Sequence, residues 1–164
     1  LLAQPNGDAK PSERTPSRQK LEPPPEVTVL SIPARDDADE ISALMLALLL
    51  NRRGVPAKSV SASALASEQV EEAARSRIRL ACVSAVPPYG TPHVRYLCKR
   101  LRSQFPQLKI VAAILNQGDA RETERRIGEV PADEIATSLK QAATEVLALI
   151  PGPREPVGQK VFSS

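Results

Sequence analysis

The 164-residue chain has few aromatic residues and few side chains that bind metals. It contains two Phe, two Tyr and no Trp, and its only histidine is His93. Recognition of unpaired bases depends on aromatic stacking, so we expect no sequence-specific nucleic acid partner. Two cysteines and one histidine are too few for a tetrahedral zinc site, and we expect no bound metal.

The chain also lacks a hydrophobic run long enough to span a bilayer. The longest run is Ile41–Leu50, interrupted only by Ser42, whereas a transmembrane helix needs about 20 apolar residues. Cys82 and Cys98 both lie in apolar stretches, and we interpret them as two buried thiols of a reduced compartment rather than as a disulfide. Because the first residue is not Met, we expect a fragment of a longer protein.

Proline is scarce in the middle of the chain and frequent at its two ends. Residues 1–26 contain six prolines, four basic and four acidic residues, and too little apolar surface to offset the entropy of ordering. They predict a disordered, Pro-rich linker. Residues 151–164 contain three more prolines and predict a flexible tail. The remaining residues, 27–150, are long enough to bury an aliphatic core.

Strand and helix patterns alternate five times between residues 27 and 150. The predicted strands are 27–32, 57–61, 78–85, 108–115 and 132–136. A helix follows each strand, which is typical of a parallel sheet covered on both faces. Right-handed crossovers make this a three-layer, doubly wound α/β domain, and five strands favour the flavodoxin-like order 2-1-3-4-5.

Two of the predicted helices have apolar residues at helical spacing, which predicts that these residues form the buried faces. In the first helix they are Ile41, Leu44, Met45, Leu48 and Leu49. In the third helix they are Val94, Leu97, Cys98, Leu101 and Phe105.

A sheet of this order binds ligands beyond the carboxyl ends of its first, third and fourth strands. The loops at these ends are residues 34–37, 84–90 and 116–119. None of them has the Gly-rich turn that lets backbone amides approach a pyrophosphate, which argues against a dinucleotide site. The candidate ligand residues are Arg35, Asp36, Asp37, Ser84, Tyr89 and Asn116.

The acidic residues after the first strand have two interpretations. Asp36, Asp37, Asp39 and Glu40 resemble the magnesium-binding acidic group of response-regulator receivers. That function also requires an acceptor aspartate after the third strand, which instead ends in Ser84. We favour the other interpretation, in which Asp37 caps the helix, Glu40 completes a capping box and Asp39 complements the positive helix start.

Ser84 and His93 also have both a structural and a functional interpretation. Ser84 can hydrogen-bond a ligand or a loop amide. His93 follows Pro92 in the first turn of the third helix, and no nucleophile is tied to it by sequence. We favour a solvent-exposed histidine over a catalytic base, and we predict no catalytic residue and no enzymatic activity.

Acidic residues are absent between Glu72 and Asp119, whereas eight basic residues lie there. Arg95, Lys99 and Arg102 follow i, i+4, i+7 spacing and predict a basic face on the third helix, opposite its apolar stripe. This face is either solvated or contacts anionic lipid headgroups, an acidic partner segment or nucleic acid.

The order of elements resembles that of the cobalamin-binding domain. Residues 132–140 are similar to the segment through which that domain enters its last helix. The family uses an Asp-x-His-x-x-Gly motif after its first strand, in which the histidine ligates cobalt and the glycine makes room for the nucleotide tail. Residues 35–41 contain neither histidine nor glycine, and Leu115-Asn116 replaces the usual Gly-Gly after the fourth strand. We therefore expect no cobalamin and no other cofactor.

The chain is also similar to the C-terminal domain of bacterial permeases of the autoinducer-2 exporter family. The similarity lies in residues 34–40, 49–55 and 92–102. It implies a non-catalytic accessory or regulatory domain that senses a ligand or binds a partner on the cytoplasmic side of the inner membrane. The rest of the permease chain would then be its partner, within one integral membrane protein.

An anionic membrane surface and a second copy of the chain are further candidate partners. Two other functions stay open at this point. One is a cobalamin-type sensor domain of a transcriptional regulator. The other is a small α/β enzyme with Ser84 and Asp36 near its site.

Overall fold

The structure, a computed structural model, describes residues 26–88 and 90–150. The predicted tail, Tyr89 and all but the last residue of the predicted linker lie outside the described residues. Strands and helices alternate along the chain as predicted. The strands are β1 (Val29–Pro33), β2 (Ala57–Ser59), β3 (Leu80–Ala85), β4 (Lys109–Ile114) and β5 (Glu134–Ala136). The helices are α1 (Asp37–Arg52), α2 (Ala66–Arg75), α3 (Thr91–Gln104), α4 (Ala120–Ile127) and α5 (Leu139–Leu149).

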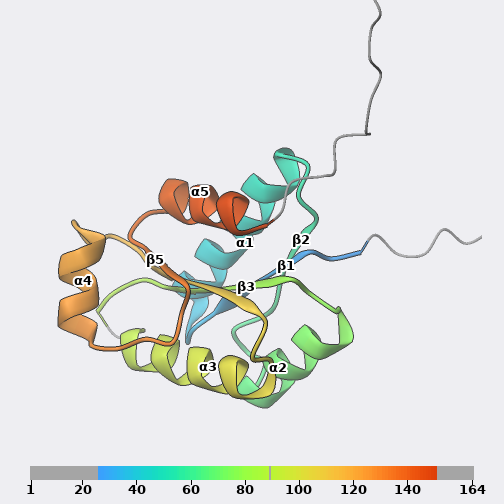
Figure 1. The fold of residues 1–164 in the computed structure, drawn as a ribbon, viewed down its shortest axis with the longest axis horizontal. Coiled ribbons are helices and arrows are strands. Elements are labelled where there is room, and N and C mark those ends of the chain that lie inside the picture. The colour runs from blue at the N-terminus through green and yellow to red at the C-terminus, as the bar shows by residue number, and fades with distance from the viewer. Residues whose placement is uncertain (1–25, 89, 151–164) are drawn as a thin grey trace, which may run out of the picture.

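The five strands form one parallel sheet in the order β2-β1-β3-β4-β5, as the sequence predicts. Helices α1 and α5 cover one face of the sheet, and α2 and α3 cover the other (Figure 1). Helix α4 lies beside β5, at one edge. The predicted three-layer, doubly wound architecture is therefore confirmed.

Side chains of the central strands alternate between two apolar cores, as the pleat of a strand requires. Val29, Leu80 and Cys82 point into the core under α1 and α5, whereas Leu30 and Ala81 point into the core over α2 and α3. Both faces of β1 and β3, and of β4 after Lys109, are buried, which explains why these strands are mostly apolar.

The two cysteines are free, buried thiols, as predicted. Cys82 lies in the core under α1 and α5, and Cys98 lies on α3 in the other core. Burial raises the pKa of both thiols, so neither is a reactive thiolate.

Helix α3 buries the stripe that its sequence predicts, but α1 does not. Val94, Leu97, Cys98 and Leu101 of α3 are buried, and Phe105, just beyond its end, is half-buried. In α1 the predicted stripe is wrong: Ile41, Leu44, Met45 and Leu48 are exposed, and Leu49 is half-buried. The buried side chains of α1 are Asp39, Ser42, Ala43, Leu46, Ala47 and Leu50.

The small residues explain this orientation of α1. Ser42, Ala43 and Ala47 have short side chains, which let the helix backbone lie close to the sheet while Leu46 and Leu50 fill the core. The larger side chains on the opposite side of the helix are left facing outward. A helix that is apolar all round has no polar face to indicate which side is exposed.

Candidate functional site

The carboxyl ends of β1 and β3 are the place where this fold can hold a ligand. The chain leaves β1 toward α1 on one face of the sheet and leaves β3 toward α3 on the other (Figure 1). Such a point of divergence opens a crevice in doubly wound sheets. Here the chain after β1 stays close to β3, because the Ala34 N–H donates to the Ser84 carbonyl at 2.9 Å. The chain after β4 also stays close to β3, because the Leu115 N–H donates to the Ala85 carbonyl at 2.9 Å.

Asp36, not Asp37, caps α1. The Asp36 side chain accepts hydrogen bonds from the N–H groups of Ala38, at 3.1 Å, and Asp39, at 3.2 Å. These bonds satisfy two of the backbone donors that a helix start leaves unpaired. Asp37 is the first residue of α1, and its side chain is exposed. The predicted capping role therefore belongs to the preceding residue.

Asp39 links α1 to the loop that follows β3. Its Oδ1 accepts a hydrogen bond from the Val86 N–H at 2.6 Å, and the residue is only 1 % exposed. Its Oδ2 has no hydrogen-bond partner in the described part of the chain. Asp39 lies in the first turn of α1, where the sequence predicts an acidic residue, and its carboxyl group also connects α1 with the β3–α3 loop.

Burial raises the pKa of Asp39 above its ordinary value, since a charged carboxylate is poorly solvated there. The hydrogen bond from Val86 opposes this shift, and the nearby Asp36 charge adds to it. The loop around Asp39 is also closely packed. A Cβ atom at Gly90 would lie 2.5 Å from the Ala85 Cβ and 3.5 Å from the Asp39 Oδ2. Only glycine fits at position 90.

Glu40 and Gln69 are further polar links in this region. Glu40 does not form the predicted capping box. Its Oε2 instead accepts hydrogen bonds from the Ser61 hydroxyl, at 3.0 Å, and the Ala62 N–H, at 2.6 Å, and so ties α1 to the β2–α2 loop. Gln69 is buried on α2 and donates to the Pro33 carbonyl at 3.4 Å. Sequence reasoning missed Gln69, because a glutamine within a helix gives no signal of a contact 36 residues away.

No hydrogen bond described for residues 26–88 and 90–150 joins any two of the other predicted crevice residues. The Ser84 hydroxyl donates to the Asp39 carbonyl of α1 at 3.4 Å, so its partner is a helix carbonyl and not a loop amide. Asn116 is exposed and has a positive φ of 58°, a conformation that asparagine tolerates well. Arg35 is exposed, and Tyr89 lies outside the described residues. His93 is exposed on α3, as predicted.

The structure removes Arg102 from the predicted basic face of α3. Its Nη2 lies 2.8 Å from the Asp133 Oδ2, and its Nη1 donates to the carbonyls of Pro106, at 3.0 Å, and Leu108, at 2.7 Å. Arg102 thus holds the α3–β4 turn and the start of β5 together. Arg95 and Lys99 line a surface groove of about 600 Å³ with residues 128–132. A role for these two residues in binding an anionic surface stays a prediction.

Asp133 is the centre of an ion-pair group with Arg102 and Lys109. Lys109 Nζ lies 3.3 Å from its Oδ1, and the Ile110 N–H donates to its Oδ2 at 2.8 Å. Burial alone would raise the pKa of Asp133, but the Ile110 N–H and the two basic side chains outweigh it and lower this pKa. This ion-pair group connects α3 and β4 with Asp133, the residue before β5.

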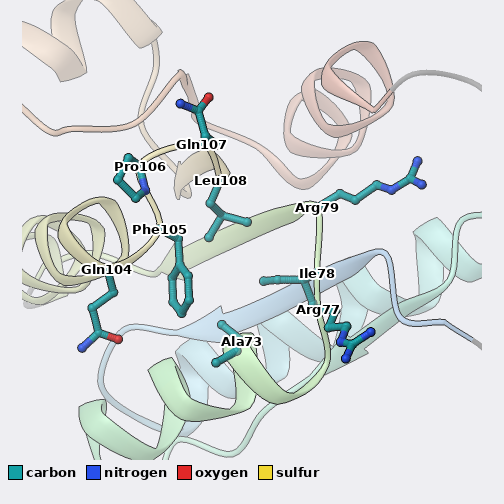
Figure 2. Close-up of a pocket in the computed structure, with 10 residues that line it drawn as sticks. Ala73, Arg77, Ile78, Arg79, Gln104, Phe105, Pro106, Gln107 and Leu108 are labelled. Carbon is teal, nitrogen blue, oxygen red and sulfur yellow. The ribbon is translucent and has the colours of Figure 1, made fainter.

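A cavity lies at the opposite end of the sheet from the carboxyl ends of the strands. Its volume is about 590 Å³. Figure 2 shows the residues that line it, which include residues of α2 and α3. Ala73, Ile78, Phe105 and Leu108 form an apolar lining, and Arg77 lies at the edge. The cavity adjoins the amino ends of β3 and β4, whereas ligands of this fold class bind at the carboxyl ends.

Within residues 26–88 and 90–150, no group of three or more His, Cys, Asp or Glu side chains is placed so that it could hold a metal ion. Within the same residues, no helix has the length and apolar composition needed to cross a membrane.

Comparison with known proteins identifies the fold. No protein-family model and no curated protein sequence matches the chain. Among solved structures, it resembles a cobalamin-binding protein from Desulfitobacterium hafniense, with a TM-score of 0.62 and 12 % identity over 77 % of this chain and 60 % of the other. It also resembles the monomethylamine corrinoid protein of Methanosarcina barkeri, with a TM-score of 0.60 and 21 % identity over 75 % of this chain and 57 % of the other.

These similarities define the chain as an α/β domain with the fold of cobalamin-binding domains. The chain spans about three fifths of the length of the two structures that it matches.

The crevice residues of this chain do not fit a cobalamin held through a histidine. The loop between β1 and α1 contains no histidine, and His93 is exposed on α3, beyond a different strand. The hydrogen bond from the Val86 N–H to Asp39 holds the β3–α3 loop against the start of α1. This chain therefore has the fold of cobalamin-binding domains without a histidine in the loop after β1.

Proposed function

We propose that the chain is a non-catalytic accessory or regulatory domain of a membrane transporter similar to the autoinducer-2 exporter permeases. The observation that carries this proposal is the way the acidic groups at the strand ends are used. Asp36 caps α1, and Asp39 ties α1 to the β3–α3 loop. Acids and nucleophiles of an active site must face a substrate, whereas these groups hold protein segments together.

The Asp39 link gives such a domain a way to respond to its surroundings. It joins the first turn of α1, on one face of the sheet, to the loop that leads from β3 to α3 on the other face. A proton or a ligand donor at Oδ2, which has no hydrogen-bond partner in the described residues, would change the charge or the geometry of the link. The position of α1 relative to the β3–α3 loop would then report that change to whatever α1 or α3 contacts.

The resemblance to the permease domain supplies the transporter part of the proposal. The similar residues form the β1–α1 loop with the first turn of α1, the end of α1 and most of α3, so only the first of these ranges and the start of α3 lie at the crevice. The most direct test uses the complete gene product that contains this chain, extracted from membranes with alkaline carbonate. We expect it to stay in the membrane pellet, and release into the supernatant would overturn the transporter assignment.

The regulatory part requires a transport measurement. In vesicles that contain the complete gene product, Asp39→Ala should change the rate of transport or its dependence on pH. Asp39→Asn, which keeps an oxygen acceptor for the Val86 N–H, should have a smaller effect on the rate. Equal transport by the wild type, both variants and a protein that lacks residues 27–150 would contradict a regulatory role.

The fold favours a second function, a cobalamin-type sensor domain of a transcriptional regulator, because two similar structures are named as cobalamin- or corrinoid-binding proteins. The absorbance spectrum of hydroxocobalamin separates the two proposals. A shift on mixing with the chain would favour the sensor, whereas we expect none because the histidine ligand is missing.

The third possibility, a small enzyme, would require Asp36, Ser84 and Asn116 to share a site, and no described hydrogen bond connects any two of them.

A further inference from the structure

Helix α1 presents an apolar stripe to the outside of the molecule. Ile41 is 60 % exposed, Leu44 49 %, Met45 48 % and Leu48 56 %. Their i, i+3, i+4, i+7 spacing places them on one side of the helix, opposite the residues that face the sheet. These four residues, the α1 stripe, are four of the six large apolar side chains that are exposed in the described part of the chain.

A single charge lies at each end of the α1 stripe. Asp37 lies one turn before Ile41, and Arg52 lies one turn after Leu48, on the same side of the helix. Both residues are exposed, and neither side chain forms an ion pair or hydrogen bond within residues 26–88 and 90–150. Residues 41–51 between them include no charged side chain. The exposed surface of α1 is therefore acidic at one end, apolar in the middle and basic at the other end.

This pattern is complementary to itself when one copy is reversed. With a two-fold axis between Leu44 and Met45, Ile41 of one copy faces Leu48 of the other, and Asp37 faces Arg52. The two-fold axis repeats each contact, as in every isologous dimer. A parallel arrangement would instead place each Asp37 beside its counterpart, where like charges repel.

We propose that the α1 stripe docks a second copy of this chain, with the two α1 helices antiparallel and an Asp37–Arg52 ion pair at each end. This goes beyond the proposed function, because it concerns how the domain assembles. A lipid surface is a poorer occupant, because helices that lie on membranes carry Lys and Arg beside the apolar face, whereas α1 begins with Asp37, Asp39 and Glu40.

The size of the stripe sets the expected strength of the dimer. Stable interfaces bury about 800 Å² on each partner, more than four half-exposed side chains supply, so we expect a dissociation constant on the order of 100 µM. Sedimentation velocity on the 164-residue chain, between about 10 µM and 1 mM, should therefore show a monomer that becomes a dimer as concentration rises.

The first variant places a charge in the stripe. Leu48→Glu should keep the chain monomeric at every concentration, because two carboxylates would be buried in each dimer. Leu65→Glu is the matched control: Leu65 is 67 % exposed but lies at the start of α2, outside the stripe, so this variant should still dimerise. Circular dichroism checks that both variants keep the fold.

Charge reversal tests the antiparallel arrangement itself. Asp37→Lys and Arg52→Glu should each weaken the dimer about three- to tenfold, since each variant replaces two ion pairs with two like-charge contacts. The double variant restores opposite charges across the axis and should recover the wild-type dissociation constant.

Several results would overturn this proposal. They are a wild-type chain that stays monomeric, a Leu48→Glu variant that still dimerises, and a double variant no stronger than the single ones. Binding of the stripe to neutral vesicles by a monomeric chain would show a membrane occupant instead. All of these measurements use the isolated chain, so they are independent of the membrane and transport tests of the proposed function.

Discussion

Helices α1 and α3 cover opposite faces of the same sheet, yet their outward surfaces differ. The outer side of α3 carries polar and basic residues such as His93, Lys99 and Ser103, whereas the outer side of α1 carries Ile41 and Leu48. Only α3 therefore follows the usual amphipathic pattern. Apolar spacing therefore identifies a buried face only when the rest of the helix is polar. A helix such as α1, which is apolar on both sides of its middle turns, has a second apolar face that packing against the sheet does not explain.

The largest expected effect is a loss of stability on truncating leucines that lie in the two cores, compared with a leucine on the outer side of α1. Leu46→Ala in α1 and Leu97→Ala in α3 should each lower the free energy of unfolding by about 2–5 kcal/mol, because each leaves a cavity in a packed core. Leu44→Ala, on the α1 stripe, should cost less than about 1 kcal/mol in the monomer. Urea unfolding at low protein concentration measures all three variants. A Leu44→Ala cost equal to that of Leu46→Ala would mean that α1 is rotated from the orientation described.

These expectations also show how far the sequence alone could go. The strand order and the buried face of α3 were predictable, because β-branched runs, turn residues and a polar opposite face each signal them. The buried face of α1 was not, since Ala43 and Ala47 carry no stronger signal than Leu44 and Leu48 do. Packing against the sheet selected the smaller residues.

The candidate site was predictable only in its location. The acidic loop after β1 is visible in the sequence, and doubly wound topology places it at the crevice. What Asp39 and Glu40 bind was not predictable, because Val86 and Ala62, their partners, lie 47 and 22 residues away. Contacts of that kind depend on how loops close over one another, and no local pattern specifies them.

The next effect concerns the link at the start of α1, which has no counterpart in α3. Asp39→Ala should lower the free energy of unfolding by about 1–3 kcal/mol, because the Val86 N–H is left without its acceptor. Asp39→Asn keeps that acceptor and should be at least as stable as the wild type at neutral pH. Thermal unfolding compares the three proteins.

The difference in stability between Asp39→Asn and the wild type should depend on pH, with a sign that follows from the pKa of Asp39. Because the pKa of Asp39 is raised in the folded state, its ionisation opposes folding. Its contribution is fully present below the ordinary value of 3.8 and is lost as pH rises through the raised pKa. The stability of Asp39→Asn relative to the wild type should therefore increase from acid to neutral pH. A constant difference would contradict the raised pKa.

A smaller effect is expected at the end of α3, where Arg102 is fastened to Asp133. Asp133→Asn should lower the free energy of unfolding by about 1–2 kcal/mol at neutral pH, because the charged hydrogen bonds to Arg102 and Lys109 are lost. Glu134→Gln, at an exposed neighbour outside the described ion pairs, is the matched control and should change little.

The free energy of unfolding at acid pH provides the second measurement for Asp133. Its pKa is lowered in the folded state, so its contribution is present above the ordinary value of 3.8 and is lost as pH falls through the lower, folded value. The gap between wild type and Asp133→Asn should close as the solution is acidified through that range. A gap that persists in strong acid would show that the variant disturbs packing rather than charge.

The smallest effect tests whether the outer side of α3 binds an anionic surface as the α1 stripe binds an apolar one. Arg95→Gln with Lys99→Gln should weaken binding to vesicles that contain anionic lipid by about fivefold, or about 1 kcal/mol. Arg53→Gln with Lys140→Gln removes the same charge from two exposed positions in the layer on the opposite face of the sheet. Both variants therefore have equal net charge, and only the first should lose affinity, in a manner that added salt suppresses. Equal losses in the two variants would mean that the attraction is general to the basic chain, and α3 would then be an ordinary solvated helix.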